Sequence, residues 1–404
     1  MDCSLNVLFV DDNEQLLHSL ARLLAARGLP WDARFAQSGS QALASLDQHP
    51  CDVVVSDANL PDMAGSELLD RIKDGWPLTL RILLTARTED SVVSGLLKSA
   101  HQLLSTPCPA LQLLDAVQTA CRLGGLYMNE AVRTVVHKLD HLPVVPKIYT
   151  ELRTELAKED FTVQAVGNII AQDMGLTAGI LKIVNSPYFG LSRRVDSPHQ
   201  AVTILGANML KGLVLYEQIF KTLDPNKYPD FNVERLWSHS LDAARCCRAL
   251  AKSEGKKGRE AEDAFLAGLL HDMGKIVLNE GASSEYIHVL RKSQAENIPL
   301  VEAEIALLGT THAEIGAYVL GLWGFGFPVV QPIAAHHEPS RYGEKDLVTA
   351  ILHCTDVFLH DIYRRKSGHS ALALDEHYMV AGGLSERMSD WQEIIVAELQ
   401  GLEA

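Results

Sequence analysis

The sequence lacks the features that mark exported or nucleic-acid-binding proteins. Its seven cysteines form no C-x-x-C pair and no framework spacing, so reduced thiols in the cytosol are expected. The first six residues have neither the basic segment nor the long apolar segment of a signal peptide. Lys and Arg number 36 against 51 Asp and Glu, and the resulting net charge of −15 opposes binding to a phosphate backbone. We therefore expect a cytoplasmic protein without a nucleic-acid partner.

Long uninterrupted apolar runs are also missing. One uncharged stretch, 315–335, reaches the length of a membrane span, but Gly321, Pro328 and Pro332 interrupt it. We interpret this stretch as buried helix and turn, so no membrane association is expected. The 404 residues are 47% hydrophobic and 22% charged, which is typical of folded proteins, and the length indicates two domains.

The first 120 residues alternate short apolar runs with helix-like segments. Residues 7–10, 53–55, 82–84 and 103–104 are typical of buried strands, and the periodic leucines after Asn13 are typical of a helix. Buried strands separated by helices predict a parallel sheet that is covered on both faces. In such a sheet, ligands bind at the carboxyl ends of the strands.

Four polar side chains follow the predicted strands at that edge: Asp11, Asp12, Asp57 and Thr85. Three carboxylates held together repel one another unless a hard divalent cation such as Mg²⁺ binds among them. With Asp57 as the nucleophile and the Thr85 hydroxyl bonded to a phosphoryl oxygen, the group could form an aspartyl phosphate. The sequence therefore predicts a magnesium-dependent phosphoacceptor site.

These residues resemble the receiver domain of two-component response regulators, which we assign to residues 1–122. In that resemblance Asp11 and Asp12 are the acidic pair, and Asn59 supplies a backbone carbonyl to Mg²⁺. Asp57 is the phosphoacceptor and Thr85 is the switch residue. The resemblance implies an α/β, flavodoxin-like, doubly wound parallel sheet. It also implies a sensor histidine kinase or a phosphotransfer protein as partner.

Two positions depart from the receiver pattern. The family usually has a lysine before the proline that follows its fifth strand, whereas this sequence has Thr106 before Pro107. Leu103 also replaces the usual aromatic residue. Loss of the lysine should weaken phosphoryl binding by one charge-assisted hydrogen bond, about 1.5–3 kcal/mol. A receiver-shaped dimerisation module that no longer transfers phosphate therefore remains an open alternative, and with it a homodimer.

Beyond residue 122 the strand-like runs end. We interpret residues 123–141 as a helical linker, and helical periodicity with capping residues continues through residues 142–404. Several ordered segments of this half resemble the HDOD output domain, which implies an all-α fold of the HD type. They are Leu142-Pro143-Val144-Val145-Pro146, Ile170-Ala171-Gln172-Asp173, Ile183-Val184-Asn185-Ser186-Pro187-Tyr188-Phe189-Gly190 and the segment from Ala201 to Leu205-Gly206.

Seven histidine and aspartate side chains are spread over the helical half at spacings that suit a helical bundle. Imidazole and carboxylate groups on facing helices can enclose one or two divalent metals such as Fe or Mn, and metal-bound water can attack a phosphate ester. Their order resembles the HD phosphohydrolase superfamily, in which Lys275 matches a lysine that contacts substrate phosphate. The remaining histidines, including His353 and His360, are interpreted as surface or packing residues. The predicted ligands are His239, His271, Asp272, His312, His336, His337 and Asp356.

The predicted output is binding rather than catalysis. HDOD domains resemble non-catalytic relatives of the superfamily, and no Gly-Tyr-Pro follows His336-His337-Glu338. We therefore expect a receiver that controls an HDOD domain, which in turn engages a downstream signalling protein. A receiver-regulated metal phosphohydrolase acting on a cyclic dinucleotide or another phosphodiester is the alternative, and a structural scaffold ranks third. Whether the chain is an enzyme stays open.

Overall fold

The computed structural model describes residues 5–77, 79–85, 99–100, 102–106, 108, 110, 113–114, 116–118, 129–138, 147–156, 158, 160–185, 195–222, 231–342, 345–367 and 372–400. One compact unit comprises residues 1–137 together with 321–327, and a second comprises residues 138–320 and 328–404. Helix α7 (Glu130–Lys138) lies within the predicted linker. The predicted boundaries at residues 122 and 142 remain predictions, and segments 142–146 and 186–190 lie outside the described residues.

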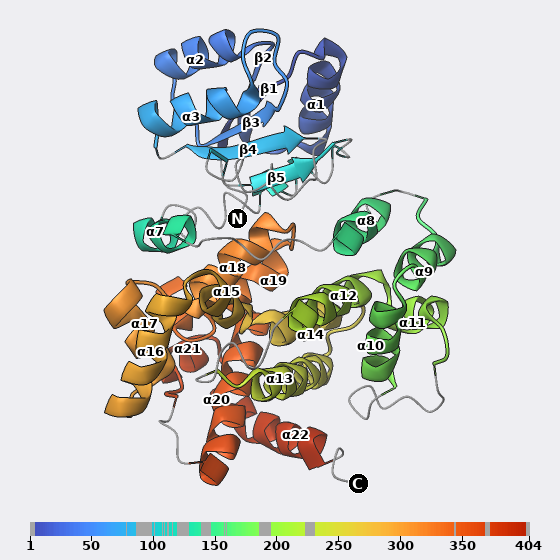
Figure 1. Cartoon of the computed structure of the whole chain (residues 1–404), viewed down its shortest axis with the longest axis vertical. Helices are drawn as coiled ribbons and strands as arrows, with labels where there is room; N and C mark the ends of the chain where they lie inside the picture. The colour runs from blue at the N-terminus through green and yellow to red at the C-terminus, as the bar shows by residue number, and fades with distance from the viewer. Residues whose placement is uncertain are drawn as a thin grey trace. The chain divides into compact units, whose positions relative to one another are not determined.

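The first unit is built on a parallel sheet of five strands in the order β2-β1-β3-β4-β5 (Figure 1). This is the strand order of flavodoxin-like folds, so the predicted fold class is confirmed. Strand β2 has no continuous apolar run, because it lies at the sheet edge with mostly half-exposed side chains, and the sequence pattern misses it. The strands are β1 (Leu5–Val10), β2 (Trp31–Ala36), β3 (Val53–Asp57), β4 (Leu80–Thr85) and β5 (Gln102–Ser105).

Three helices of this unit cover the sheet. Helix α1 (Glu14–Arg27) begins after Asn13, whose side chain caps the first turn, and ends at Gly28 in the left-handed conformation. Buried side chains of α2 (Gly39–Gln48) and α3 (Gly65–Gly75) form one core with a face of the sheet. Helix α1 lies on the other side of the sheet (Figure 1). The sheet is therefore buried on both faces, as its apolar strands require.

The second unit is helical throughout its described residues, which confirms the predicted class (Figure 1). Thr162, Asp173, Ser197 and Asn232 each accept a hydrogen bond from a first-turn N–H and so begin a helix. Its elements are α8 (Lys147–Leu156), α9 (Val163–Ala171), α10 (Met174–Val184), α11 (Pro198–Leu205), α12 (Ala207–Thr222), α13 (Val233–Ser253), α14 (Arg259–Leu270), α15 (Met273–Gly281), α16 (Ser283–Glu296), α17 (Leu300–Leu308), α18 (His312–Leu322), α19 (Phe327–Ala335), η2 (Pro339–Tyr342), α20 (Leu347–Ser367), α21 (Glu376–Ala381), η3 (Ser385–Arg387) and α22 (Met388–Gln400).

The apolar stretch 315–335 folds as most of α18 and α19 with a turn between them. Ile315, Val330 and Ile333 are fully buried, so the interpretation of this stretch as buried helix and turn is confirmed. Within the part of the chain that the structure describes, no helix is long and apolar enough to cross a membrane.

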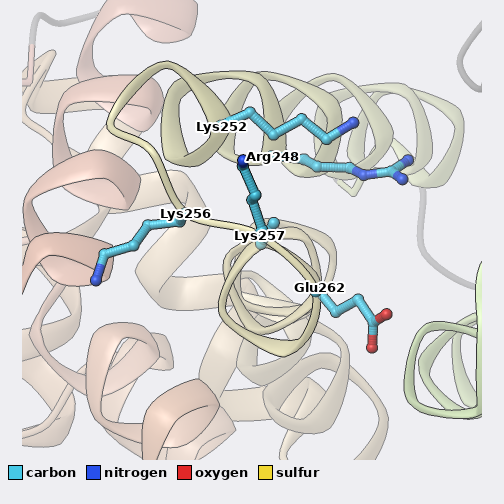
Figure 2. Close-up of a pocket in the computed structure, with 7 residues that line it drawn as sticks. Arg248, Lys252, Lys256, Lys257 and Glu262 are labelled. Carbon is cyan, nitrogen blue, oxygen red and sulfur yellow. The ribbon is translucent and has the colours of Figure 1, made fainter.

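Helices α13 and α14 pack closely against each other and are joined by the short turn 254–258 (Figure 2). Gly255 and Gly258 in this turn have φ angles of 77° and 54°, which favour glycine over residues with a Cβ. A Cβ on Gly268 of α14 would lie 2.7 Å from a backbone carbonyl oxygen of α13, so glycine permits the close approach. Helix α13 carries the predicted metal ligand His239, and α14 ends directly before the predicted ligand His271.

Candidate phosphoacceptor site and candidate metal centre

The predicted receiver residues lie at the carboxyl edge of the parallel sheet. Asp11 directly follows β1, Asp57 is the last residue of β3, and Thr85 is the last residue of β4. Because β1 pairs with β3 and β3 pairs with β4, the three strand ends are neighbours. Asp11 and Thr85 are buried, Asp57 is half-buried, and Asp12 and Asn59 are exposed.

Backbone donors orient the carboxylates at this edge. Asn13 N–H donates to Asp11 Oδ1 at 2.8 Å. Asn59 N–H donates to Asp57 Oδ2 at 2.7 Å. Burial raises the pKa of Asp11, and the negative charges of Asp57 and Asp12 raise it further. A bound cation would relieve this repulsion, so the residues fit the predicted Mg²⁺.

The loop after Asp57 is held by close contacts. A Cβ on Gly65 would lie 2.0 Å from the Asp57 carbonyl oxygen, so glycine is required there. At the first turn of α2, the Asp62 carboxylate accepts the Gly39 N–H at 2.9 Å. It also accepts the Ser40 hydroxyl at 2.6 Å and the Ser40 N–H at 2.8 Å. These bonds, led by that of the hydroxyl, lower the pKa of Asp62 to about 2.

Thr106 stands where receivers usually have lysine. Its N–H donates to the Thr85 carbonyl oxygen at 3.0 Å, which places it directly beside the predicted switch residue. Pro107 and the side chain of Leu103 lie outside the described residues. The departure from the receiver pattern is therefore located at the predicted site itself, where a neutral side chain replaces a cation.

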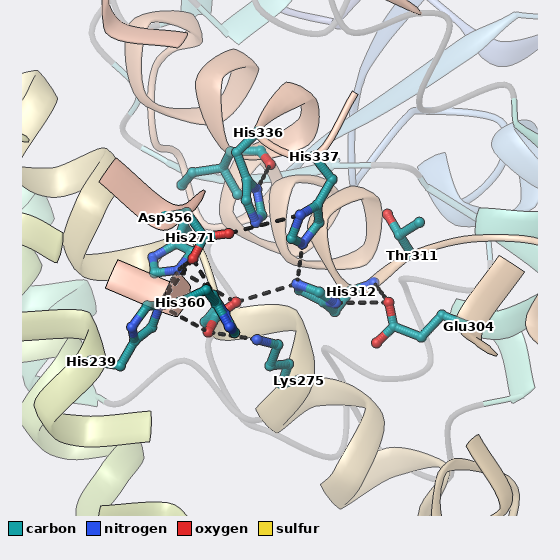
Figure 3. A network of polar contacts seen from close by, with 12 residues as sticks. His239, His271, Lys275, Glu304, Thr311, His312, His336, His337, Asp356 and His360 are labelled. Atoms are coloured by element: carbon teal, nitrogen blue, oxygen red, sulfur yellow. Dashed lines mark hydrogen bonds and ion pairs between the residues drawn. The ribbon is translucent and has the colours of Figure 1, made fainter. Parts of the chain in front are cut away.

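The seven predicted metal ligands converge inside the helical unit, and the six that are labelled in Figure 3 point toward one another. They come from α13, the junction of α14 and α15, the start of α18, the residues after α19, and the middle of α20. All are buried except His337, whose side chain is 10% exposed. The fold thus brings together every member of the set that the sequence predicts.

One half of the cluster consists of His239, His271, Asp272 and Asp356. His239 Nε2 lies 3.1 Å from Asp356 Oδ1 and 3.2 Å from His271 Nε2. His271 Nε2 lies 3.5 Å from Asp272 Oδ1 and 3.6 Å from Asp356 Oδ1. Two imidazoles and two carboxylates at these distances are suited to surround a divalent ion.

The other half consists of His312, His336 and His337. His312 Nε2 lies 3.0 Å from His337 Nε2 and 3.3 Å from Asp272 Oδ1. The rings of His336 and His337 have their centroids 3.9 Å apart. His337 Nδ1 lies 3.8 Å from Asp356 Oδ2. Asp272 and Asp356 therefore border both halves of the cluster.

Three of these imidazoles are oriented by acceptors on the side away from the cluster. His271 Nδ1 and His336 Nδ1 lie 2.8 and 2.7 Å from backbone carbonyl oxygens of the preceding turn. His312 Nδ1 lies 2.7 Å from Glu304 Oε2. Because these oxygens only accept, each Nδ1 carries a proton, and in the neutral form of each ring the Nε2 lone pair is then directed at the cluster.

Ring nitrogens of several histidines converge at the centre of the cluster. The Nε2 pairs of His312–His337 and His239–His271 are 3.0 and 3.2 Å apart, and the buried His336 Nε2 has no hydrogen-bond partner among the described residues. Burial and the nearby histidines lower the pKa of His336 to about 3 and that of His337 well below its usual value. Neutral imidazoles beside carboxylates are the donor set of a divalent transition metal, so the residues fit such an ion.

The predicted substrate-binding Lys275 lies at the cluster. Its Nζ is 2.7 Å from Asp272 Oδ2, one turn earlier in the chain. Although burial favours the neutral acid, His271 and Lys275 hold the pKa of Asp272 well below its usual value. A Cβ on Gly274 would lie 1.8 Å from the His312 carbonyl oxygen, so this glycine lets α15 meet the start of α18.

Two further histidines border the cluster; His353 is a packing residue as expected, whereas His360 belongs to a candidate ligand group with His239 and Asp356. His360 Nε2 lies 3.6 Å from Asp356 Oδ1, and the spacing of four residues on one helix could have signalled this. His353 Nδ1 donates to the His336 carbonyl oxygen at 2.6 Å. Its Nε2 accepts the Asp375 N–H at 2.8 Å, so His353 joins the chain around His336 to a neighbouring loop.

Glu304 is a site residue that the sequence analysis does not identify. It is fully buried, and Oε2 accepts both the His312 N–H at 2.9 Å and the His312 ring N–H. Its Oε1 accepts the Tyr286 hydroxyl at 2.9 Å. Glu304 therefore fixes both the backbone and the ring of His312, and no sequence pattern around it indicates this.

Family models match the chain along these two units. Residues 7–118 match the response regulator receiver domain, and residues 142–339 match the HDOD domain. The chain thus carries a response regulator receiver domain followed by an HDOD domain. Receiver domains bind Mg²⁺, and a receiver domain implies a phosphodonor kinase as partner. The buried histidine and aspartate cluster is consistent with a metal site.

Known relatives match parts of the chain. An uncharacterized protein of Treponema pallidum (strain Nichols) is 28% identical over 223 residues, which are 54% of this chain and 42% of that protein. The transcriptional regulatory protein KdpE of Mycobacterium tuberculosis (strain CDC 1551 / Oshkosh) is 35% identical over 117 residues, 29% of this chain and 50% of KdpE. The chain therefore spans half or less of the length of these relatives. A solved HDOD domain protein of unknown function from Geobacter sulfurreducens is 26% identical, with a TM-score of 0.48, over 66% of this chain and 96% of that chain.

Proposed function

We propose that this protein is a response regulator in which phosphorylation of Asp57 controls a metal-binding HDOD domain that engages a downstream signalling protein. The supporting observation is the buried convergence of seven ligands, three of them imidazoles whose Nδ1 is already bonded to an acceptor. Such a group is costly to bury without an ion, because lone pairs and carboxylates face one another. Binding of a partner protein, rather than turnover, is the proposed output.

In the receiver, the Asp57 carboxylate is the proposed nucleophile. It takes a phosphoryl group from a phosphohistidine of a sensor kinase or phosphotransfer protein, so that a phosphorus–nitrogen bond breaks and a phosphorus–oxygen bond forms. Asn59 N–H orients the carboxylate, and the Thr85 hydroxyl is proposed to donate to a phosphoryl oxygen. Mg²⁺ held by Asp11, Asp12 and the Asn59 carbonyl would neutralise charge at this edge.

Labelling with a small phosphodonor tests the receiver step. The full chain with Mg²⁺ should gain a phosphoryl group, and Asp57→Asn should not. Asp47→Asn, at an exposed position of the same unit, is the matched control and should be labelled like the wild type. Equal absence of labelling in the wild type and Asp57→Asn would instead favour a receiver-shaped module that forms a homodimer.

The helical cluster is proposed to hold one or two ions of Fe, Mn or another divalent metal. A metal there supplies Lewis acidity and lowers the pKa of bound water. Burial keeps His336 and His337 neutral by lowering their pKa, and it excludes bulk water from the cluster. The proposed ligands are His239, His271, Asp272 and Asp356 for one ion, and His312, His336 and His337 for another.

A metal-dependent phosphohydrolase is the second candidate, and the position of Lys275 favours it. Its ammonium lies at the cluster, where a charge-assisted bond to a substrate phosphate is within reach of its side chain. The assay is hydrolysis of a cyclic dinucleotide and of simple phosphodiesters with Mn²⁺ or Fe²⁺. Activity that is lost in His271→Ala combined with Asp272→Ala would support the enzyme, whereas activity that survives would exclude this cluster.

A further inference from the structure

A pocket of about 400 Å³ lies between the C-terminal end of α13 and the start of α14 (Figure 2). Arg248 and Lys252 extend side by side from α13, and Lys257 lies beside them in the connecting turn. Lys256 points away from these three, and its Nζ pairs with Glu260 Oε1 at 2.6 Å. Three cationic groups therefore face one small volume.

The positive charge of this pocket runs against the charge of the chain, which is −15. Among the described residues, no carboxylate lies within ion-pair distance of Arg248, Lys252 or Lys257. Burial lowers the pKa of Arg248, and burial and the Arg248 charge lower the pKa of Lys252. Two carboxylates act in the opposite direction, Glu262 on the pKa of Arg248 and Glu398 on that of Lys252, and they offset only part of these shifts. An anion bound among the three cations would relieve the rest.

The remaining lining restricts what kind of anion fits. Ala261 and Gly258 are small, and no aromatic side chain lines the pocket, so a nucleobase would find no stacking surface. Gly258 precedes α14 without a side-chain cap, so the partial positive charge of the first-turn N–H groups adds to that of the cations. Arginine and lysine together match the multiple acceptor oxygens of phosphate groups.

We propose that this pocket binds a small polyphosphate anion, either free pyrophosphate or the phosphate chain of a nucleotide. The volume is in the range of small-molecule sites. The site is separate from the metal ligands, although α13 carries both Arg248 and His239. It does not depend on whether the cluster binds metal or turns over a substrate.

Calorimetric titration of the full chain with pyrophosphate, without added divalent metal, tests the proposal. The wild type should bind, and Arg248→Gln combined with Lys252→Gln should bind at least about tenfold more weakly, a difference of about 1.4 kcal/mol. Arg291→Gln with Lys292→Gln removes the same two charges from α16 and should leave affinity within about twofold. Lys257→Gln, at an exposed turn position, gives a second test if the double variant folds poorly.

The same titration with a nucleoside triphosphate and with its nucleoside identifies the source of the phosphates. Equal affinity for pyrophosphate and the triphosphate indicates a free anion, and tighter binding of the triphosphate indicates a nucleotide. Elemental analysis of the variants should show unchanged metal, which separates this pocket from the metal centre. No heat with either phosphate ligand, or an equal loss in the Arg291 and Lys292 control, would overturn the proposal.

Discussion

The two candidate sites differ in how the chain surrounds them. At the receiver edge, Asp12 and Asn59 are exposed and Asp57 is half-buried. In the helical cluster, His271 and Asp356 are 2% exposed or less. An edge built from exposed oxygen ligands exchanges its ligands readily, whereas buried imidazoles and carboxylates hold an ion for long periods. We infer that the receiver site is built for a reversible signal and the cluster for a resident ion.

The difference follows from secondary structure. At the strand ends, backbone N–H groups of Asn13 and Asn59 orient the carboxylates, so little else has to be buried. Between helices most backbone groups are already bonded, so apart from carbonyl oxygens such as those beside His271 and His336, the contacts that hold the ligands come from side chains. Glu304 shows the consequence, because one buried carboxylate has to hold another buried side chain in place.

Of the changes proposed here to compare the buried cluster with the exposed receiver site, removal of Asp272 should have the largest effect. Asp272→Ala deletes the carboxylate that borders both halves of the cluster and leaves Lys275 without its partner. We expect loss of bound metal and a fall of about 3 kcal/mol in the free energy of unfolding. Elemental analysis and calorimetry of the full chain check both. His288→Ala, at an exposed position of α16, should keep its metal, and full metal retention in Asp272→Ala would contradict a metal centre here.

Replacement of Glu304 should weaken the same centre without deleting a ligand. Glu304→Gln removes the charge that orients the His312 ring, and loss of such a contact lowers metal affinity by about 10- to 100-fold. Competition with a chelator measures the affinity. Glu302→Gln makes the identical change at an exposed position of α17 and serves as the control. Equal affinity in both variants would mean that Glu304 only fills the core.

On the receiver side of the comparison, introduction of a lysine at Thr106 should increase phosphorylation of Asp57. Thr106→Lys returns the cation that receivers usually have beside the switch residue, where Thr106 now bonds to the Thr85 carbonyl. One charge-assisted hydrogen bond corresponds to about tenfold more labelling of Asp57 at a limiting phosphodonor concentration. Thr106→Met adds length without charge and should behave like the wild type. The same gain in both variants would point to side-chain size rather than charge.

Much of the fold can be predicted, because buried strands and helix starts produce recognisable patterns of residues in the sequence. Strands β1, β3 and β4 are covered on both faces and therefore show as apolar runs, and Asn13 and Thr162 cap helices where the sequence indicates a start. Strand β2 is the exception. Its edge position leaves Trp31 and Arg34 half-buried, so it shows no continuous apolar run, and only the alternation of Trp31, Ala33 and Phe35 with charged residues marks it as a strand.

The residues of the candidate sites could be predicted only where their order in the sequence matches a known set of site residues. The seven histidine and aspartate positions keep the order of a known ligand set, so they could be identified one by one. Glu304 could not, because it resembles the exposed Glu302 in every local respect. Its burial comes from the packing of α16, whose Tyr286 bonds to it, and that contact exists only once the helices are assembled.

The smallest expected effect concerns Asp263 of α14. Its replacement tests whether the helical unit also buries an ionisable group away from the cluster. Burial raises the pKa of Asp263 from 3.8 to about 6, whereas hydrogen bonds lower the pKa of the exposed Asp62 to about 2. Because the folded chain favours the protonated Asp263, its contribution to stability is fully present below about pH 4 and is lost as the pH rises through about 6.

Asp263→Asn should therefore be more stable than the wild type near pH 7, by about 1 kcal/mol once solvent screening and the nearby Arg259 are allowed for. This advantage should vanish near pH 4, where the wild-type carboxyl is itself neutral. Calorimetry of the full chain over this range measures it, with the exposed Asp390→Asn as control. An advantage that does not change with pH would mean that burial does not raise the pKa of Asp263, and the contrast between the two units would then be confined to the metal cluster.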